Sequence, residues 1–501
     1  MNDILATSIG GTEAGHPQHG GHFSQCEKSG MRSAVCRSFA GISLLTAVLV
    51  AHAATRPHYG GTLRIETRAK VMSIGPAEWP AGAEADALLA FHELIFDRLV
   101  RLDANGEPQP DLALSWEHDA QNKTWLFTLR PGVKWHDGAP LTAQEVESAL
   151  AGAAPGMSVR VTKEGTLEIR MNEPRPDLLA VLATDPAWMI RRPSPVPSDA
   201  LPIGTGPFRL TAWEAGRRAA FQANDSYWGG RPFVDSIEVQ MGRSSREQLI
   251  DLELDKADVV EVDPVEARRA QQENRRIWTS APLDLLAIAF DLNKAVVQDR
   301  RLREAIAGSI DRAAIQKVLL QNYGEATGSI LPRWVSGYAF LFPATMDLNR
   351  ARQLTAQIGT PPTLKLGYDA SDPLSRQLAE RVAVNARDAG ITLEVSPLPA
   401  GWRHMPDTGT DLRVTRTRIN APSLDAAFRQ AAASLEFPAD AGAGSAERTY
   451  AAEQKVLDAF SVVPLVAAEE VIGLGPHVKD WSALPWGAWR IEDVWLEAAK
   501  P

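Results

Sequence analysis

The chain has few of the residues and segments on which redox chemistry and membrane insertion depend. Cysteine occurs only twice in 501 residues, as Cys26 and Cys36. Both cysteines precede the end of a predicted signal peptide, so we expect a mature chain with neither a disulfide nor a thiolate nucleophile. After that peptide, no apolar run reaches the roughly 20 residues that a membrane-spanning helix needs. Thiol chemistry and a transmembrane segment are therefore not expected in the mature protein.

Residues 31–54 have the features of a secretory signal peptide. Two arginines give it a positively charged start, the apolar run that follows is too short to cross a bilayer, and Ala51-His52-Ala53 matches the small-x-small cleavage pattern. We expect cleavage after Ala53 or Ala54. We also expect Met31 to be the true start, with residues 1–30 as an upstream extension. These features predict a soluble protein that is exported to the periplasm.

Charge and histidine spacing restrict the partners of the mature chain. Three acids and three bases lie in residues 1–53, so their removal leaves the formal charge at −10. A mildly acidic chain without a basic patch offers no electrostatic footprint for nucleic acid. The close histidine group of His16, His19 and His22 precedes the predicted cleavage point, and the later histidines lack ligand spacing. We expect no nucleic-acid partner, no metal and no cofactor, and we expect the chain to act as a monomer.

Strand and helix patterns alternate along the rest of the sequence. Residues 60–67 alternate apolar and polar side chains after a glycine pair, which predicts a half-buried strand. Residues 85–102 carry apolar side chains at helical spacing, and residues 374–389 do the same. Residues 158–171 predict two strands joined by a turn. This alternation is typical of an α/β fold around a partly parallel sheet.

Residues 112–150 predict strand, turn, strand, turn and helix. Trp125 and Phe127 share one face of a strand, and Thr142 with Glu145 forms a capping box ahead of the helix. Aromatic residues that alternate with polar ones on strands are more often core residues than ligand contacts. We therefore expect core positions for Trp116, Trp125, Trp135, Phe208 and Trp228.

Enzyme motifs are not found after the predicted signal. The sequence has no Gly-x-Ser-x-Gly elbow and no His-Glu-x-x-His pair. Gly204-Thr205-Gly206 is followed by a proline and a strand pattern, whereas a dinucleotide-binding loop opens into a helix. We expect that the protein is not an enzyme, and a secreted hydrolase is the disfavoured alternative.

Long motifs in a fixed order carry a family resemblance. The first combines GGTLRIE, FDRLVRLDANGEPQPDLALSWE and KTWLFTLRPGVKWHDGAPLTAQEV. The second combines GTGPFRLTAWEAG and NDSYWGGRPFVDSIEV, and the third is FDLNKAVVQDRRLREAIAGSIDRAAI. With these motifs the chain resembles the family 5 extracellular solute-binding proteins, which are the peptide-, oligopeptide- and nickel-binding components of ABC importers.

The resemblance implies a bilobal α/β fold of the periplasmic-binding-protein type (class II), with a small inserted domain. It implies a first lobe in residues 55–100, 200–280 and 466–501, the inserted domain in residues 101–199, and a second lobe in residues 281–465. The implied function is a periplasmic binding protein that captures a peptide-like or other small organic solute between its lobes. Its partner would be an ABC permease of the inner membrane. The alternative is a metal-chelate or anionic-solute binding protein, or a sensor.

Peptide-binding members of this family carry the pattern Trp-x-x-Asp-Tyr-x-x-Pro, whose aspartate pairs with the amino terminus of the ligand. When Pro422 is matched to that proline, Arg418 takes the position of the aspartate and Arg416 lies close to that of the tryptophan. Arginine suits carboxylate or phosphate, so one hypothesis is a cationic clamp of two arginines on one strand face. The equally weighted alternative is that both arginines are solvated or pair with Asp411 or Asp425.

Three aromatic residues are further candidates for ligand contact. Trp79 follows the first predicted strand, where the family has a ligand-facing loop, and Trp334 and Tyr338 lie in LPRWVSGYAF. Each can stack on a ligand, although packing is as well supported for Trp79 and somewhat less so for Trp334. The predicted ligand-binding residues are Arg416, Arg418, Trp334, Tyr338 and Trp79. No catalytic residue and no metal-binding residue is predicted.

Overall fold

Eleven strands of the chain form one mixed sheet, with β13 (Gly324–Ala326) paired to β17 beside the main strand order. Parallel pairs join β1 to β10 and β11, and join β14 to β15 and β16, as expected for a partly parallel sheet. Across the sheet the strands are β15 (Leu393–Pro397), β14 (Leu364–Tyr368), β16 (Leu412–Arg418), β12 (Arg276–Phe290), β17 (Val462–Leu474), β11 (Val259–Glu261), β1 (Thr62–Glu66), β10 (Ser236–Gln240), β9 (Arg218–Ala223) and β8 (Phe208–Glu214).

The structure is a computed structural model in which residues 55–501 form one compact unit. The predicted signal peptide, Trp79, Tyr338 and Pro422 lie outside the described residues. None of the described helices is long and apolar enough to span a membrane. The described residues are 57–75, 83–103, 106–153, 156–163, 165–192, 201–337, 342, 344–399, 402, 405, 407–421, 423–437, 446–483 and 489–497.

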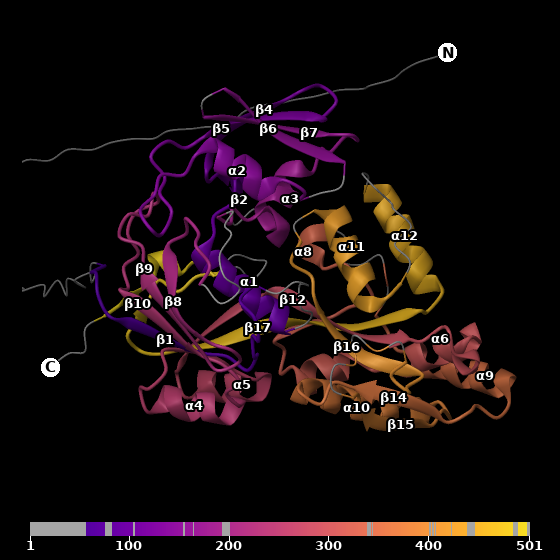
Figure 1. Cartoon of the computed structure of the whole chain (residues 1–501). Coiled ribbons are helices and arrows are strands. Elements are labelled where there is room, and N and C mark those ends of the chain that lie inside the picture. Colours follow the sequence, from indigo (N-terminus) through magenta and orange to yellow (C-terminus); the bar gives the residue numbers. More distant parts are fainter. Residues whose placement is uncertain are drawn as a thin grey trace, which may run out of the picture. The chain divides into compact units, whose positions relative to one another are not determined.

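Helices pack along the sheet in two main groups. In Figure 1, α4 and α5 lie beneath β1, whereas α6, α9 and α10 lie at the end of the sheet that carries β14 and β15. The first group consists of α1 (Ala83–Ile95), α4 (Ser245–Glu253) and α5 (Pro264–Gln272). The second consists of α6 (Arg300–Ser309), α7 (Arg312–Ala314), the π-helical turn Ile315–Leu319, α8 (Arg333–Ser336), α9 (Leu348–Ile358), α10 (Pro373–Asp388), α11 (Leu424–Leu435) and α12 (Ala446–Asp458).

Two large hydrophobic cores lie along the sheet, and smaller clusters form where α4 meets α5 and where α8, α11 and α12 meet. The first core gathers residues of α1, β1, β8–β10 and the C-terminal segment, including Phe91, Phe208, Phe221, Ile237 and Val494. The second core gathers residues of β12, α6, α10, β14 and β16, including Leu286, Ile306, Leu378, Leu366 and Val414. The long antiparallel strands β12 and β17 contribute to both sides of the sheet. The residue boundaries expected for the lobes and the inserted domain remain a prediction.

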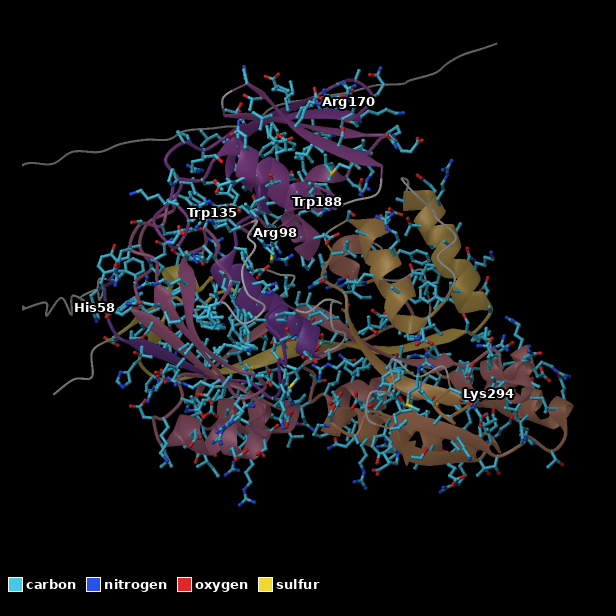
Figure 2. The ribbon with its side chains drawn as sticks, viewed as in Figure 1. His58, Arg98, Trp135, Arg170, Trp188 and Lys294 are labelled. Atoms are coloured by element: carbon cyan, nitrogen blue, oxygen red, sulfur yellow. The ribbon has the colours of Figure 1, made fainter. Side chains whose placement is uncertain are left out.

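A third core lies between a smaller sheet of four antiparallel strands and the helices that pack on it. Trp125 and Phe127 face this core together, as predicted, and Trp135 and Trp188 are buried in it (Figure 2). Arg170 is exposed on the same sheet (Figure 2). The sheet order is β4 (Ala113–His118), β5 (Thr124–Leu129), β7 (Thr166–Met171) and β6 (Met157–Lys163), accompanied by α2 (Ala143–Leu150) and α3 (Leu178–Thr184).

Local signals predicted several element boundaries correctly. The capping box of Thr142 and Glu145 opens α2, and each of its two residues accepts a hydrogen bond from the backbone of the other. The strand predicted at residues 60–67 is β1, and the helix predicted at residues 374–389 is α10. Capping and periodicity act within a few residues, which is why the sequence alone reveals them.

The helix predicted at residues 85–102 is wrong in its second half. Helix α1 ends at Ile95, and residues 100–102 form β2, which pairs with β3 (Pro108–Pro110). The backbone N–H of Gly206 donates to the carbonyl of Ile95 at 2.9 Å. A distant chain segment thus occupies the carbonyl that a continuing helix would use, and tertiary contacts override the local periodicity.

Candidate ligand-binding site

A cavity of about 550 Å³ lies between elements of the first core and elements of the second core. Its walls are formed by α1, the segment after β1, the start of α10 and the side of β16 that carries Val414, Arg416 and Arg418. A volume of this size falls within the usual range for small-molecule sites. The lining residues come from 67–70, 84–90, 261–264, 369–375, 414–418 and 468–471, together with Asp284, Trp402 and Trp489.

The cavity wall carries more acidic than basic side chains. Among the described lining residues, nine carboxylates face four cationic groups, which gives these residues a formal charge of −5. The basic residues are Arg68, Lys70, Arg416 and Arg418. Arg68 is paired with Glu261 at 2.7 Å and with Asp263 at 2.6 Å. The cavity therefore does not contain a cationic clamp that is free of neighbouring acids.

Arg416 and Arg418 both bind the carboxylate of Asp284. Arg416 donates from Nε at 3.0 Å and from Nη2 at 2.5 Å to Oδ2 of Asp284. Arg418 donates from Nε to Oδ1 at 2.9 Å and from Nη2 to Oδ2 at 3.4 Å. The Asp284 side chain is only 2 % exposed. One buried carboxylate thus holds two guanidinium groups.

Strand register produces this arrangement. In the antiparallel pair β12–β16, Asp284 lies opposite Arg418, and Leu286 lies opposite Arg416. Arg416 and Arg418 line the cavity with Val414, whereas Arg413 is not among the lining residues and pairs with Glu436 at 2.5 Å. The predicted shared face of Arg416 and Arg418 is therefore present, because side chains alternate along a strand.

The alternative in which Arg416 and Arg418 pair with Asp411 or Asp425 is wrong. Asp411 accepts a hydrogen bond from the backbone N–H of Lys365 at 2.8 Å, and Asp425 pairs with Arg429 on the same helix. Sequence proximity suggested Asp411 and Asp425, but β12 brings in Asp284 from more than a hundred residues away. Tertiary pairing of strands selects the partner.

Burial and charge shift the pKa values of this cluster in different directions. Burial alone raises the pKa of Asp284, but Arg416 and Arg418 outweigh it and hold that pKa well below its usual range. Asp284 in turn raises the pKa of Arg416. Burial raises the pKa of Asp86 to about 6, although Arg418 opposes the shift, and burial also raises the pKa of Glu470. The arginines stay charged, while burial raises the pKa of both neighbouring acids.

Both arginines keep one terminal nitrogen that does not bind Asp284. Nη1 of Arg416 lies 3.8 Å from Oδ2 of Asp372, and Nη1 of Arg418 lies 3.5 Å from Oε2 of Glu470. These two carboxylate oxygens are buried and accept no hydrogen bond in the structure as described. The two Nη1 donors of the cavity thus lie beside buried carboxylate oxygens that have no hydrogen bond among the described residues.

A family model describes bacterial extracellular solute-binding proteins, family 5 (middle region), and it matches residues 107–437. The chain belongs to this family.

Relatives of this family 5 protein differ in the ligands that their names state. The dipeptide-binding protein of Escherichia coli (strain K12) is 24% identical over 350 residues, which cover 60% of this chain and 65% of that relative. The nickel-binding periplasmic protein of the same strain is 23% identical over 342 residues, which cover 60% and 65%. The chain therefore matches less than two thirds of the length of these curated relatives.

Solved structures share the fold of this family 5 protein. NikA from Brucella suis in complex with Fe(III)-EDTA has a TM-score of 0.76 at 20% identity, with 87% of this chain and 100% of that chain covered. The dipeptide binding protein from Pseudoalteromonas sp. SM9913 in complex with Met-Leu has a TM-score of 0.76 at 16% identity, with the same coverage. The expected α/β fold of periplasmic binding proteins is confirmed.

Of the three aromatic residues that the sequence predicts as ligand contacts in this family 5 protein, the structure describes only Trp334. Trp334 on α8 packs against the third core and is not among the residues that line the cavity. Trp79 and Tyr338 fall outside the described residues. Two other tryptophans line the cavity, and of these Trp402 donates from Nε1 to Oδ2 of Asp369 at 3.3 Å. The other is Trp489, so the aromatic surface that the described residues give the cavity comes from positions that the sequence analysis did not select.

Sequence reasoning also missed the acidic residues of the cavity. Asp284 stands alone in the apolar strand LDLLAIAF, and Glu470 follows the apolar run VVPLVAA with one other acid. A lone carboxylate in a buried strand requires a cationic partner, because burying an unpaired charge is costly. This requirement is the signal that would have connected Asp284 to the arginines of β16. Across the described residues, no group of three or more His, Cys, Asp or Glu side chains is arranged to hold a metal ion.

Proposed function

We propose that this protein is the periplasmic solute-binding component of an ABC importer, and that it captures a small organic solute in the cavity between the first and second cores. It would act without catalysis, as a monomer, and deliver the solute to a permease of the inner membrane. The predicted signal peptide supports export to the periplasm. Family membership supports the binding role.

The observation that carries the proposal is the pairing of donors and acceptors in the cavity wall. Nη1 of Arg416 and Nη1 of Arg418 can donate to a ligand carboxylate, which a guanidinium binds well. The described lining residues also carry nine carboxylates, and carboxylates of this wall can accept hydrogen bonds from an ammonium group of the ligand. A zwitterionic, peptide-like solute satisfies both requirements at once.

The ligands of relatives agree with this class of solute. One relative is named a dipeptide-binding protein, and one solved structure of the same fold is described in complex with Met-Leu. The nickel-binding relative and the Fe(III)-EDTA complex of NikA keep a metal chelate as the second candidate. Chelates such as these carry carboxylates that Arg416 and Arg418 would bind in the same way.

The predicted contacts of Arg416 and Arg418 with the ligand are part of this proposal. Trp79 and Tyr338 remain proposed contacts, and Trp334 is the weakest of the five candidates because it packs against the third core. Trp402 and Trp489 are added as apolar walls of the cavity. Aromatic walls beside a few polar groups are the usual composition of a small-molecule site.

A thermal-shift screen of residues 55–501 tests the proposal. The probes are the dipeptide Ala-Ala as a zwitterion, succinate as a dianion, putrescine as a dication and the nickel–histidine complex as a chelate. A ligand present at about 100 times its dissociation constant stabilises the folded state by about 2.7 kcal/mol and raises the melting temperature. We expect Ala-Ala to give the largest rise.

Matched arginine variants identify the site. Arg418→Ala should abolish the shift caused by Ala-Ala, whereas Arg429→Ala should keep it, because Arg429 lies on α11 and pairs with Asp425 away from the cavity. A shift with putrescine alone would contradict the role of the arginines. A shift with the nickel complex alone would replace the zwitterion by the chelate as the solute.

A further inference from the structure

We infer that Asp284 is a positioning residue that orients Arg416 and Arg418 and thereby sets the charge preference of the cavity. The inference rests on the proposed function, since it concerns the same site. Asp284 does not need to touch the solute. The role of Asp284 is to determine which nitrogen atoms of Arg416 and Arg418 remain available to the solute.

The hydrogen bonds of Asp284 divide each guanidinium into two parts. Arg416 and Arg418 each direct Nε and Nη2 at the Asp284 carboxylate, over distances from 2.5 to 3.4 Å. Nη1 of each arginine remains, and it makes no hydrogen bond within the described ranges of the chain. A planar guanidinium whose Nε and Nη2 are fixed has its third nitrogen fixed as well. Asp284 therefore fixes the direction of both Nη1 donors.

Two arginines at neighbouring positions of one strand face need such a partner. Residues i and i+2 of a strand project from the same face, so the charges of Arg416 and Arg418 repel each other. Asp284 compensates one of the two charges, and Asp372, Glu470 and Asp86 lie 3.5–3.8 Å from the same two guanidinium groups. A ligand carboxylate that reaches the Nη1 donors therefore has protein carboxylates beside it, which disfavours a dianion more than a zwitterion.

Removal of the Asp284 charge should change both affinity and selectivity. In Asp284→Asn, the amide NH₂ meets two guanidinium donors, and only one oxygen remains to accept their hydrogen bonds. The arginines would rotate apart with their full charge of +2. We expect Ala-Ala to bind about thirtyfold more weakly or worse, which is the lower end of the effect seen when a buried charge pair loses one partner. Succinate should gain affinity relative to Ala-Ala.

The test combines calorimetry with a measurement that needs no ligand. Binding of Ala-Ala and of succinate is measured by titration calorimetry for the wild type, Asp284→Asn and Asp284→Glu. Arginine labelling by phenylglyoxal, followed by peptide mapping, reports how firmly Arg416 and Arg418 are held. Their side chains are 32 % and 14 % exposed. Asp425→Asn is the matched control, because it removes a carboxylate that pairs with an arginine outside the cavity.

We expect Asp284→Asn to accelerate labelling of Arg416 and Arg418 by about fivefold, since both lose their anchored donors. In Asp284→Glu, labelling of both arginines should be slow again, and part of the Ala-Ala affinity should return. This variant provides the test if Asp284→Asn does not fold. Unchanged labelling in a folded Asp284→Asn protein would overturn the inference. An unchanged ratio of Ala-Ala to succinate affinity would overturn the selectivity claim.

Failure of the proposed function is distinguishable from failure of this inference. If the wild type binds neither Ala-Ala nor succinate, the proposed solute class is wrong. Labelling of Arg416 and Arg418 then still shows whether Asp284 holds them, because that measurement needs no ligand. Slow labelling in the wild type, fast labelling in Asp284→Asn and slow labelling in Asp284→Glu support the positioning role by themselves.

Discussion

Asp86 and Arg418 approach each other across the cavity, with Oδ2 of Asp86 3.5 Å from Nε of Arg418. Asp86 belongs to α1, whose apolar side packs in the first core, and Arg418 ends β16, whose apolar side packs in the second core. The ion pair therefore joins the two sides of the cavity directly. Its strength depends on the charge of Asp86.

The charge of Asp86 should make stability depend on pH. Its pKa rises from the ordinary 3.8 to about 6, mainly through burial. Between these two values the folded state keeps a proton that the unfolded state has released. The contribution of Asp86 to stability is thus complete below pH 3.8 and is lost as the pH rises through about 6. The loss amounts to about 3 kcal/mol at most, as an order of magnitude.

Urea unfolding of the wild type and of Asp86→Asn from about pH 4 to pH 7.5 isolates this contribution, because other buried carboxyls are common to both proteins. We expect Asp86→Asn to gain stability relative to the wild type as the pH rises. Glu84→Gln, on the same helix, is the control and should follow the wild type. A difference between Asp86→Asn and the wild type that stays constant over this range would contradict the prediction.

Gly204 should tolerate no side chain. A Cβ atom at this position would lie 2.0 Å from the carbonyl oxygen of Ile95 and 2.7 Å from the ring of Phe96. Because the obstacle is backbone at the end of α1, we expect Gly204→Ala to lose about 3 kcal/mol or more of its free energy of unfolding. Gly75→Ala is the control, since a Cβ there meets nothing within 4 Å. Equal melting temperatures for the two variants would refute the close approach.

Trp135 should be a main contributor to the stability of the third core. Its side chain is 1 % exposed, and its Nε1 has no hydrogen-bond partner among the described residues. We expect Trp135→Ala to cost about 3–5 kcal/mol by thermal or urea unfolding. Trp135→Phe should cost clearly less, since it keeps a six-membered aromatic ring in the core and loses only the remaining part of the indole with its unpaired N–H. Leu126→Ala on the exposed face of β5 should have little effect, and a similar cost for both alanine variants would argue against this core.

The capping box at α2 should stabilise the helix start by a measurable amount. The backbone N–H of Glu145 donates to Thr142 Oγ1 at 3.2 Å, and that of Thr142 donates to Glu145 Oε2 at 2.9 Å. Thr142→Ala should therefore cost about 1 kcal/mol in the free energy of unfolding. Ser148→Ala lies inside the same helix and should be neutral or slightly stabilising, because alanine is the better helix former. Equal results for the two variants would show that the cap contributes nothing.

The sequence predicted features that depend on near neighbours. Periodicity gave β1 and α10, a capping box gave the start of α2, and the alternation of β16 placed Arg416 and Arg418 on one face. The family motifs gave the fold, since each contains turns and strands whose residues act over short distances. Helix α1 was predicted too long because its end is set by Gly206, which lies more than a hundred residues away.

The sequence by itself determined the family and the kind of fold, and it predicted Arg418 where peptide-binding relatives carry an aspartate, with Arg416 close to the position of their tryptophan. Only the tertiary structure decided what those arginines do. Strand pairing across β12 supplies Asp284, α1 supplies Asp86 and β17 supplies Glu470, so a clamp that looked cationic in the sequence lies in an acidic cavity. The physical reason is that the charge of a buried site is the sum over elements that meet only after folding, whereas a sequence motif shows just one of them.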